Sequence, residues 1–430
     1  MTDSYLPTGG DDSYGVDEYA LDLRYRVATN RLEGTATIRA TSLGMLRSFA
    51  LDLSRLRATK VRIAGQKAAR FTQSAHKLVV TPASPIAAGE QFTVVVDYAG
   101  APGPRSSKWG TVGWEELADG VIVAAQPSGA STWFPCNDRV DDKAAYDIRF
   151  AADQAYTVVC NGELTARRAS AGLAHWHYVQ PEPTATYLAT VQLGRYVLDD
   201  VDLAGVSGVR AYPRAIAARV EADLAALPAM MGFFADRFGP YPFATYTVVV
   251  TADDLEIPLE SQGLATFGAN HMDGAGGSER LVAHELAHQW FGNSVGLTRW
   301  SDIWLNEGFA CYSEWLWSEE RGGPSADTLA RQHRRRLASE PADLVLSDPT
   351  PALMFDDRVY KRGALLLHAL RLTIGTEPFF ALLAAWTAQY RHTTATTEDF
   401  RALAATLTDV PLEALFDAWL SATRLPALPR

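Results

Sequence analysis

Cysteine is scarce in this chain of 430 residues. Its three cysteines, Cys136, Cys160 and Cys311, are odd in number and widely spaced, so they form neither a disulfide framework nor a metal-ligand spacing. Long apolar runs are also lacking: none approaches the length of a membrane span, and the polar N-terminal stretch has no apolar core of a signal peptide. We therefore expect free buried thiols, no membrane partner and a cytoplasmic protein.

Positive charge is in deficit. The chain has 39 Lys and Arg against 50 Asp and Glu, a net charge of −11, which argues against nucleic acid as a partner because phosphate binding needs clustered basic residues. The densest basic run, Arg331–Arg336, lies in a helical pattern and is interpreted as a solvated helix face. A hydrophobic content of 47% with 21% charged residues is typical of a folded protein, and the length predicts two domains.

Alternating apolar and polar residues dominate the N-terminal half of the chain. Tyr19, Leu21 and Leu23 alternate with polar residues at the period of a half-buried strand, and turn-forming residues separate many of the later runs. Many short strands with regular turns predict an antiparallel β-sandwich or a saddle-shaped sheet. Further strands are expected at Thr35–Ala40, Phe49–Leu53, Val61–Ile63, Leu78–Val80, Phe92–Tyr98, Val121–Ala125, Tyr146–Phe150, Tyr156–Cys160, Ala174–Val179, Tyr187–Leu193 and Tyr246–Thr251.

The period changes to that of helices near residues 200–210. Arg214–Phe238 has helical spacing, with Pro228 predicting a kink or break. We predict an α+β multidomain protein with an N-terminal β domain at 1–204, which contributes to the substrate site, and a mainly helical catalytic domain at 205–430. Later helices are expected at about 279–291, 303–320, 325–339, 359–374, 377–390, 397–408 and 411–422.

Histidine is rare, yet two histidines stand one helical turn apart. Of the nine in the chain, His284 and His288 enclose Glu285 in a His-Glu-x-x-His motif within a run of helical periodicity. Residues at i and i+4 share a helix face, so both imidazoles can point at one ion. A lone histidine on a half-buried helix is usually an ordinary core residue, but the motif and a later carboxylate favour a metal site. Imidazole suits Zn²⁺, and a catalytic zinc takes three protein ligands and leaves a fourth position for water.

Glu307 is the predicted third ligand. It follows His288 after eighteen residues, inside a second helical pattern, and Gly292, Asn293 and Gly296 supply the break between the two helices. A helix, a turn and a returning helix can bring this carboxylate to the same ion. We therefore expect one Zn²⁺ per chain.

Glu285 is the predicted general base. Zn²⁺ lowers the pKa of bound water to about 7, and Glu285 is adjacent to the first ligand but rotated off the ligand face, so it can accept a proton instead of binding the metal. The motif therefore predicts metal-assisted hydrolysis of an amide or related bond. Asp302 and Glu314, which flank the third ligand, either orient a histidine or form surface salt bridges; both interpretations stay open.

Three segments together resemble the gluzincin aminopeptidases of the aminopeptidase N family. Asn306–Ala310 continues the ligand pattern as Asn-Glu-Gly-Phe-Ala. Gln126–Asp138 resembles the part of the family's N-terminal β domain that reaches into the active site, and Val359–Arg371 resembles the helix that carries its catalytic tyrosine. The resemblance spans nearly the whole chain and implies a thermolysin-like catalytic domain, a zinc cofactor, and release of residues from the N-termini of peptides.

The resemblance also implies roles for single residues. Tyr360 matches the tyrosine that stabilises the oxyanion, Glu260 matches the glutamate that binds the free α-amino group of the substrate, and Gln126 matches a second position that contacts the amine. One departure is the run Ile257-Pro258-Leu259-Glu260-Ser261, where the family usually has Gly-x-Met-Glu-Asn. The flexible glycine and the asparagine are missing, so the sequence leaves the pocket for the first residue of the substrate undefined.

Larger members of this family carry further C-terminal domains. The chain ends directly after its last predicted helix, so we expect a short form with a more open site, and a monomer. Alternatives are epoxide hydrolase or endopeptidase-like activity at the same site, or a non-catalytic binding relative. The intact His284, Glu285, His288, Glu307 and Tyr360 argue against the non-catalytic relative, and an aminopeptidase is the preferred hypothesis.

Overall fold

The computed structural model describes residues 3–429 and divides the chain into two compact units. Unit 1 comprises the chain up to Asp200 together with Gly208–Ala217 and Phe243–Asn270; unit 2 comprises Val201–Ser207, Ala218–Pro242 and the chain from His271 onward. Each unit is thus built from segments that are separated in sequence. The predicted single boundary between residues 204 and 205 stays a prediction.

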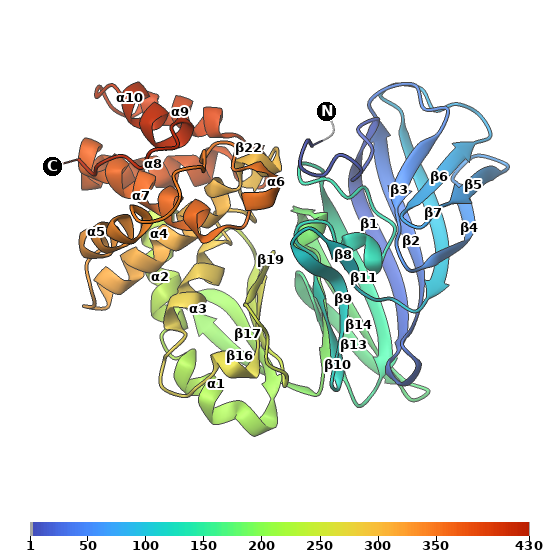
Figure 1. The fold of residues 1–430 in the computed structure, drawn as a ribbon. Helices are drawn as coiled ribbons and strands as arrows, with labels where there is room; N and C mark the ends of the chain where they lie inside the picture. Colours follow the sequence, from blue (N-terminus) through green and yellow to red (C-terminus); the bar gives the residue numbers. More distant parts are fainter. Residues whose placement is uncertain (1–2, 430) are drawn as a thin grey trace. The chain divides into compact units, whose positions relative to one another are not determined.

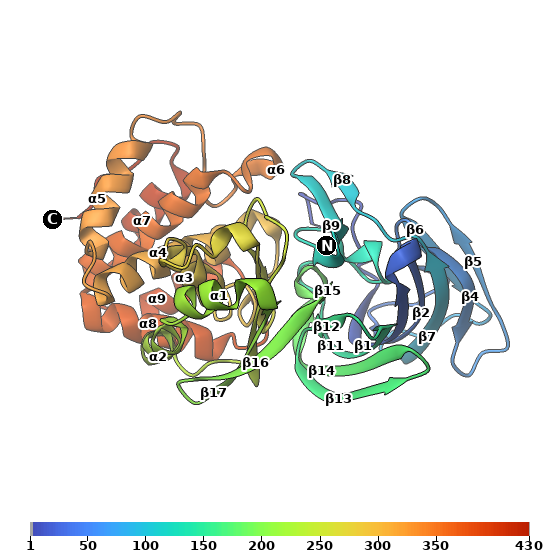
Figure 2. The same cartoon turned by 90° about the horizontal axis from the view of Figure 1, so that it is seen from below.

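A seven-stranded sheet is the largest element of unit 1 (Figure 1). Its order is β13-β14-β11-β1-β2-β7-β4, and Figure 2 shows how the sheet curves along this order. The pair β1 and β11 is parallel, whereas β1 pairs with β2 in antiparallel register. The strands are β1 (Tyr14–Arg26), β2 (Arg31–Ser42), β4 (Arg57–Ile63), β7 (Gln91–Gly100), β11 (Lys143–Asp153), β13 (Glu163–Ser170) and β14 (Leu173–Ala185).

Two smaller sheets complete the N-terminal part of unit 1. One has the order β12-β15-β10-β9-β8 and the other the order β3-β6-β5. Aromatic side chains fill the core of this region: the Tyr19 ring stacks on Tyr146 at 5.1 Å and meets Phe134 edge-on at 5.2 Å. The strands are β3 (Phe49–Asp52), β5 (Ala69–Gln73), β6 (Lys77–Pro82), β8 (Arg105–Ser107), β9 (Gly110–Leu117), β10 (Gly120–Ala124), β12 (Thr157–Cys160) and β15 (Val191–Gly194).

A further five-stranded sheet follows in the chain, with the order β16-β17-β18-β20-β19. The strand β18, rich in valine and buried along most of its length, pairs with β20 in parallel, and β19 pairs with β20 in antiparallel register. Of these strands the sequence predicted only β18: β19 and β20 are short, and β16 and β17 lie on either side of the expected domain boundary. Their bounds are β16 (Tyr196–Leu203), β17 (Val206–Pro213), β18 (Thr245–Val250), β19 (Leu259–Ser261) and β20 (Leu264–Phe267).

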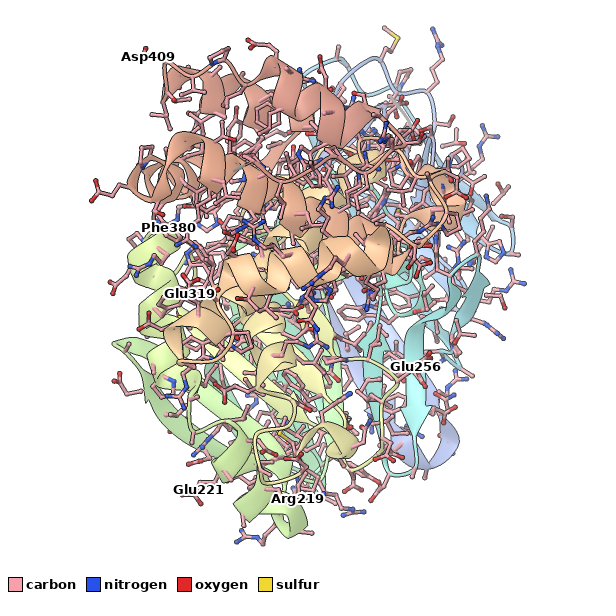
Figure 3. All side chains as sticks on the ribbon, turned by 60° about the vertical axis from the view of Figure 1, so that its left-hand side comes forward. Arg219, Glu221, Glu256, Glu319, Phe380 and Asp409 are labelled. Carbon is pink, nitrogen blue, oxygen red and sulfur yellow. The ribbon has the colours of Figure 1, made fainter. Side chains whose placement is uncertain are left out.

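Unit 2 is mainly helical, which together with the β-rich N-terminal part confirms the predicted α+β class. Arg371 of α7 contacts two neighbouring helices: it donates to Glu319 of α4 at 3.3 Å and lies over the ring of Phe380 of α8. Figure 3 labels Glu319 and Phe380 on these two helices. The helices are α1 (Ala217–Asp223), α2 (Leu227–Phe238), α3 (Glu279–Ala287), α4 (Trp304–Glu320), α5 (Ala326–Leu337), α6 (Thr350–Leu353), α7 (Asp357–Ile374), α8 (Thr376–Gln389), α9 (Thr397–Thr406) and α10 (Glu413–Phe416); the short strands β21 (Gly296–Leu297) and β22 (Thr394–Ala395) pair in parallel.

The helices α4 and α7 cross at two glycines. A Cβ atom added to Gly308 would lie 2.8 Å from the Cα atom of Gly363, closer than real side chains approach. Only glycine at both positions allows the two backbones to meet so closely. This contact holds the start of α4, which carries Glu307, against α7, which carries Tyr360.

Two expectations about the whole chain can be compared with the structure. Cys136, Cys160 and Cys311 are free and buried, as predicted. Among residues 3–429, none of the helices combines the length and the apolarity needed to cross a bilayer.

Candidate active site

The helix α3 presents both histidines of the motif. His284 lies in its last turn and His288 is its C-terminal cap, so the two residues are one turn apart on one face. Their rings are 4.8 Å apart and nearly perpendicular, and both side chains are buried. After the helix, the chain turns at Gly292, whose φ of +116° is a conformation that favours glycine.

The helix α4 returns Glu307 to the two imidazoles. Its Oε2 atom lies 3.4 Å from His284 Nε2 and 3.5 Å from His288 Nε2. The three ligand atoms lie within 4.8 Å of one another in a buried cluster. The structure thus brings the three predicted zinc ligands together.

The outer nitrogen of each imidazole has its own acceptor. His284 Nδ1 lies 2.7 Å from Glu314 Oε1, and Arg280 holds the other oxygen of that carboxylate at 2.8 Å. His288 Nδ1 donates to the carbonyl oxygen of Phe291 at 3.1 Å. A partner on Nδ1 fixes the tautomer in which Nε2 is the ligand atom.

Of the two acids that flank Glu307 in sequence, Glu314 therefore contacts a histidine and Asp302 does not. Asp302 instead accepts hydrogen bonds from Thr397 at 2.6 Å and from Arg299 at 2.8 Å. Sequence reasoning missed the role of Arg280, although it lies four residues before His284 and could have been placed on the same helix face.

The donor set fits a divalent metal cation. Burial alone would raise the pKa of Glu307, but the imidazoles of His288 and His284 lower it to about 2. Burial would lower the pKa of His284, but its hydrogen bonds to Glu307 and Glu314 raise it to about 10. The cluster thus favours a positive charge at the point where the three ligand atoms meet. Two imidazole nitrogens and one carboxylate oxygen are a typical set of protein ligands for zinc.

Glu285 and Tyr360 are the other predicted residues in unit 2. Glu285 follows His284 on α3 and is buried, with its side chain rotated by about 100° from that of the first ligand, as helix geometry requires. Tyr360 lies in the first turn of α7, and its ring is inclined by 19° to that of His284 at a centroid distance of 6.1 Å. Unit 2 therefore holds the three ligand positions, the predicted base and the predicted oxyanion donor.

The remaining two predicted residues, Gln126 and Glu260, meet in unit 1. Gln126 follows β10, and Glu260 is the middle residue of β19. Gln126 Nε2 donates to Glu260 Oε1 at 2.5 Å, although 134 residues separate them in the chain. Ile257, part of the run that departs from the family pattern, is 63% exposed.

Two family models match the chain. The peptidase M1 N-terminal domain matches residues 16–188, and the peptidase family M1 domain matches residues 223–419. Together they include all seven predicted site residues, because Gln126 lies in the first match and the other six lie in the second.

Curated relatives are aminopeptidases. Endoplasmic reticulum aminopeptidase 1 of Mus musculus is 28% identical over 395 residues, which cover 84% of this chain and 42% of the relative. Aminopeptidase M1 of Arabidopsis thaliana is 26% identical over 339 residues, which cover 72% of this chain and 37% of the relative. The chain thus spans about two fifths of the length of the curated relatives that it matches.

Solved structures match over the full chain. An M1 zinc metallopeptidase from Deinococcus radiodurans, solved as a mutant bound to a Tyr-Ser-Ala substrate, is 30% identical with a TM-score of 0.91, and the match covers 100% of this chain and 99% of that one. A two-domain M1 zinc metallopeptidase bound to L-tryptophan is also 30% identical, with a TM-score of 0.90 and the same coverage.

Proposed function

The chain belongs to peptidase family M1, and on that premise we propose that it is a zinc aminopeptidase that hydrolyses the first peptide bond of peptides with a free N-terminus. The observation that carries the proposal is the convergence of His284 Nε2, His288 Nε2 and a Glu307 carboxylate oxygen in one buried cluster. Small peptides are the proposed substrates, since a relative of matching length was solved with a tripeptide substrate.

His284, His288 and Glu307 would hold the zinc ion in this mechanism. When bound, zinc supplies a Lewis acid and lowers the pKa of water to about 7. Glu314 and the Phe291 carbonyl keep both imidazoles in the tautomer that binds metal through Nε2.

Glu285 and Tyr360 act on the reacting groups. The Glu285 carboxylate accepts a proton from the attacking water and returns it to the nitrogen of the leaving amine, because a buried carboxylate beside the first ligand is suited to proton transfer. The Tyr360 phenol donates a hydrogen bond to the carbonyl oxygen as that oxygen becomes negatively charged. A donor aimed at developing charge in a dry site contributes about 2.7–4 kcal/mol to transition-state stabilisation.

Glu260 and Gln126 bind the N-terminus of the substrate. The Glu260 carboxylate accepts hydrogen bonds from the ammonium group, and the side-chain oxygen of Gln126 accepts another. The hydrogen bond from Gln126 Nε2 to Glu260 Oε1 supports this assignment, because it fixes the amide so that its oxygen is available to the ammonium group. Binding at this point would align the first peptide bond for hydrolysis and make the enzyme an exopeptidase.

Hydrolysis of an aminoacyl amide is therefore compared with hydrolysis of its N-acetylated form. We expect only the free amine to be cleaved, with activity lost when zinc is chelated and regained when zinc is restored. Glu260→Gln should raise KM for the free-amine substrate at least about tenfold. Glu256→Gln, an exposed acid in the loop that precedes β19 (Figure 3), is the matched control and should behave like the wild type. Equal cleavage of the blocked substrate would refute an aminopeptidase and favour endopeptidase-like activity.

A further inference from the structure

A cavity of about 260 Å³ in unit 1 is lined by basic side chains. Three arginines, Arg55, Arg57 and Arg105, and one histidine, His76, face it together with small and amide side chains. No Asp or Glu occurs in the part of the lining that the structure describes. This is unexpected in a chain with a net charge of −11, because acidic residues outnumber basic ones.

We propose that this cavity is a binding site for a phosphate-bearing anion. It is separate from the residues assigned to catalysis and does not depend on the proposed function. Guanidinium groups match the oxygens of a phosphate in paired hydrogen bonds, and three of them around one cavity can neutralise a doubly charged group. At about 30 Å³ per liquid water, the cavity has room for a phosphate and a small organic substituent.

The arginines retain donors for such a ligand. Arg55 uses Nε and Nη2 on the carbonyl oxygen of Pro104, which leaves Nη1 available. Among the described residues, the Arg105 side chain has a single long hydrogen bond, 3.4 Å from Nη1 to the Ser128 carbonyl oxygen, and its buried Nε has no partner. Since a buried donor without an acceptor costs about 1–3 kcal/mol, an anion that accepts from Arg105 would recover part of that cost.

Arg57 is exposed at the start of β4, where its backbone pairs with Ala99, and within residues 3–429 its side chain makes no hydrogen bond or ion pair. Arginines elsewhere in unit 1 often pair with acids, as Arg62 of the same strand does with Asp97. A guanidinium without a partner at the edge of a basic cavity can donate hydrogen bonds to a ligand bound there. The backbone conformation of Arg55 is also unusual, since its φ of +67° is rare for a residue with a side chain.

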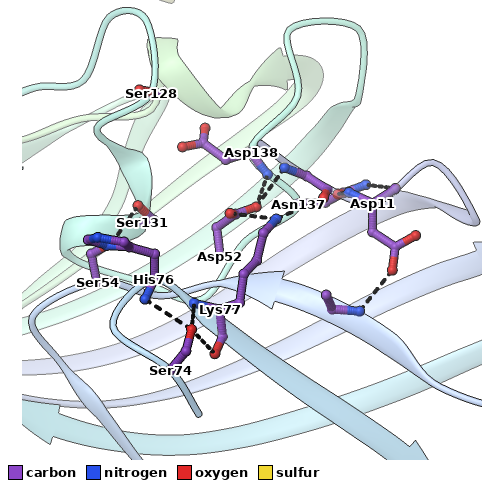
Figure 4. Close-up of polar contacts among 12 residues, drawn as sticks. Asp11, Asp52, Ser54, Ser74, His76, Lys77, Ser128, Ser131, Asn137 and Asp138 are labelled. Atoms are coloured by element: carbon purple, nitrogen blue, oxygen red, sulfur yellow. Dashed lines mark hydrogen bonds and ion pairs between the residues drawn. The ribbon is translucent and has the colours of Figure 1, made fainter. Parts of the chain in front are cut away.

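The polar wall of the cavity is held in place by neighbouring residues (Figure 4). Ser54 Oγ lies 3.1 Å from His76 Nδ1 and 3.4 Å from Ser131 Oγ. These contacts engage one ring nitrogen of His76 and leave Nε2 for the ligand.

Two acids in the same region have partners of their own. Asp52 is bonded to Lys77 Nζ at 2.7 Å and accepts from two backbone N–H groups, those of Gly10 and Asp138 (Figure 4). Burial, with Asp52 beside it, raises the pKa of Asp138 to about 7. Neither acid is among the residues that line the cavity, although the charge of Arg105 acts to lower the pKa of Asp138.

Calorimetric titration of the zinc-loaded full chain with glucose 6-phosphate, at constant ionic strength, tests the proposal. We expect saturable binding that is at least about tenfold weaker in Arg57→Gln and in Arg105→Gln. Arg168→Gln, an exposed arginine of β13, removes the same charge elsewhere in unit 1 and should bind like the wild type. Because Arg57 is exposed, its replacement should leave the melting temperature unchanged, so weaker binding there cannot come from unfolding.

A parallel titration with inorganic phosphate identifies the source of the anion. Equal affinity for phosphate and the ester would assign the site to free phosphate, and tighter binding of the ester would assign it to an organic phosphate; both support the proposal. No saturable binding to the wild type would overturn it. Binding of undiminished strength in Arg57→Gln and Arg105→Gln would also overturn the proposal. If that binding were lost when zinc is removed, the anion would be assigned to the metal.

Discussion

Replacing Glu314 by glutamine removes a negative charge next to a proposed zinc ligand and preserves the size of the side chain. Glu314 Oε1 lies 2.7 Å from His284 Nδ1, and its other oxygen is 2.8 Å from Arg280 Nη1. The Glu314 side chain is only 2% exposed, so water cannot substitute for it. Because the carboxylate makes the imidazole a stronger base and fixes its tautomer, we expect Glu314→Gln to bind zinc more weakly.

The expected loss can be worked out from the contact. Removing the carboxylate partner of a metal-bound histidine weakens metal affinity by about 10–100-fold, which equals about 1.4–2.7 kcal/mol. A hydrogen bond to a charged group contributes about 1.5–3 kcal/mol, so the two estimates agree. The assay is a competition between the protein and a chromogenic zinc chelator at neutral pH.

Asp302→Asn is the matched control. Asp302 is also buried and also flanks Glu307, but its oxygens accept from Thr397 and Arg299 instead of a histidine. Its replacement should lower the free energy of unfolding by about 1–3 kcal/mol and leave zinc affinity unchanged. The reasoning is refuted if Glu314→Gln binds zinc within about twofold of the wild type, or if Asp302→Asn weakens zinc binding as strongly.

Other variants test the remaining parts of the site. Glu285→Gln should retain one zinc per chain by elemental analysis while kcat falls by about 10²–10⁴, and full activity would remove Glu285 from the mechanism. Tyr360→Phe should lower kcat by about 10²–10³ with a small change in KM, whereas an unchanged kcat would exclude an oxyanion contact. Gly308→Val should lower the free energy of unfolding by about 1–3 kcal/mol or more in urea titrations, because its side chain would overlap Gly363; unchanged stability would show that the helices can separate there. Zinc at 100 times its Kd should stabilise the chain by about 2.7 kcal/mol in thermal unfolding, and no shift would contradict binding to the folded state alone.

Much of the fold could be predicted where one face of an element is buried. Tyr19, Leu21 and Leu23 are buried on β1 as their alternation predicts. In contrast, β13 is exposed at every position, so no apolar alternation marks it as a strand. The helix expected at 411–422 is divided into α10 and a π-helical turn at Asp417–Ser421, a change of hydrogen-bond pattern that hydrophobic spacing does not encode.

The family, the α+β fold, the metallopeptidase class and zinc as the cofactor are confirmed by the family and structure comparisons. They were predictable because short motifs in this chain carry specific chemistry. The assignment of single residues to base, oxyanion donor, ligand and amine contact stays a proposal with the tests given above.

Spacing predicts a site only when one secondary-structure element delivers most of its groups. His284 and His288 share a face of α3, so their separation along the chain already fixes their separation in space. Gln126 and Glu260 come from different strand regions, and their contact depends on how the sheets of unit 1 assemble, so only a resemblance could suggest it. The basic cavity is still harder to predict from sequence, because its arginines and histidine come from loops and strand ends and no motif or resemblance connects them. Such a site becomes visible only when the folded chain shows charged groups without the partners that charge normally requires.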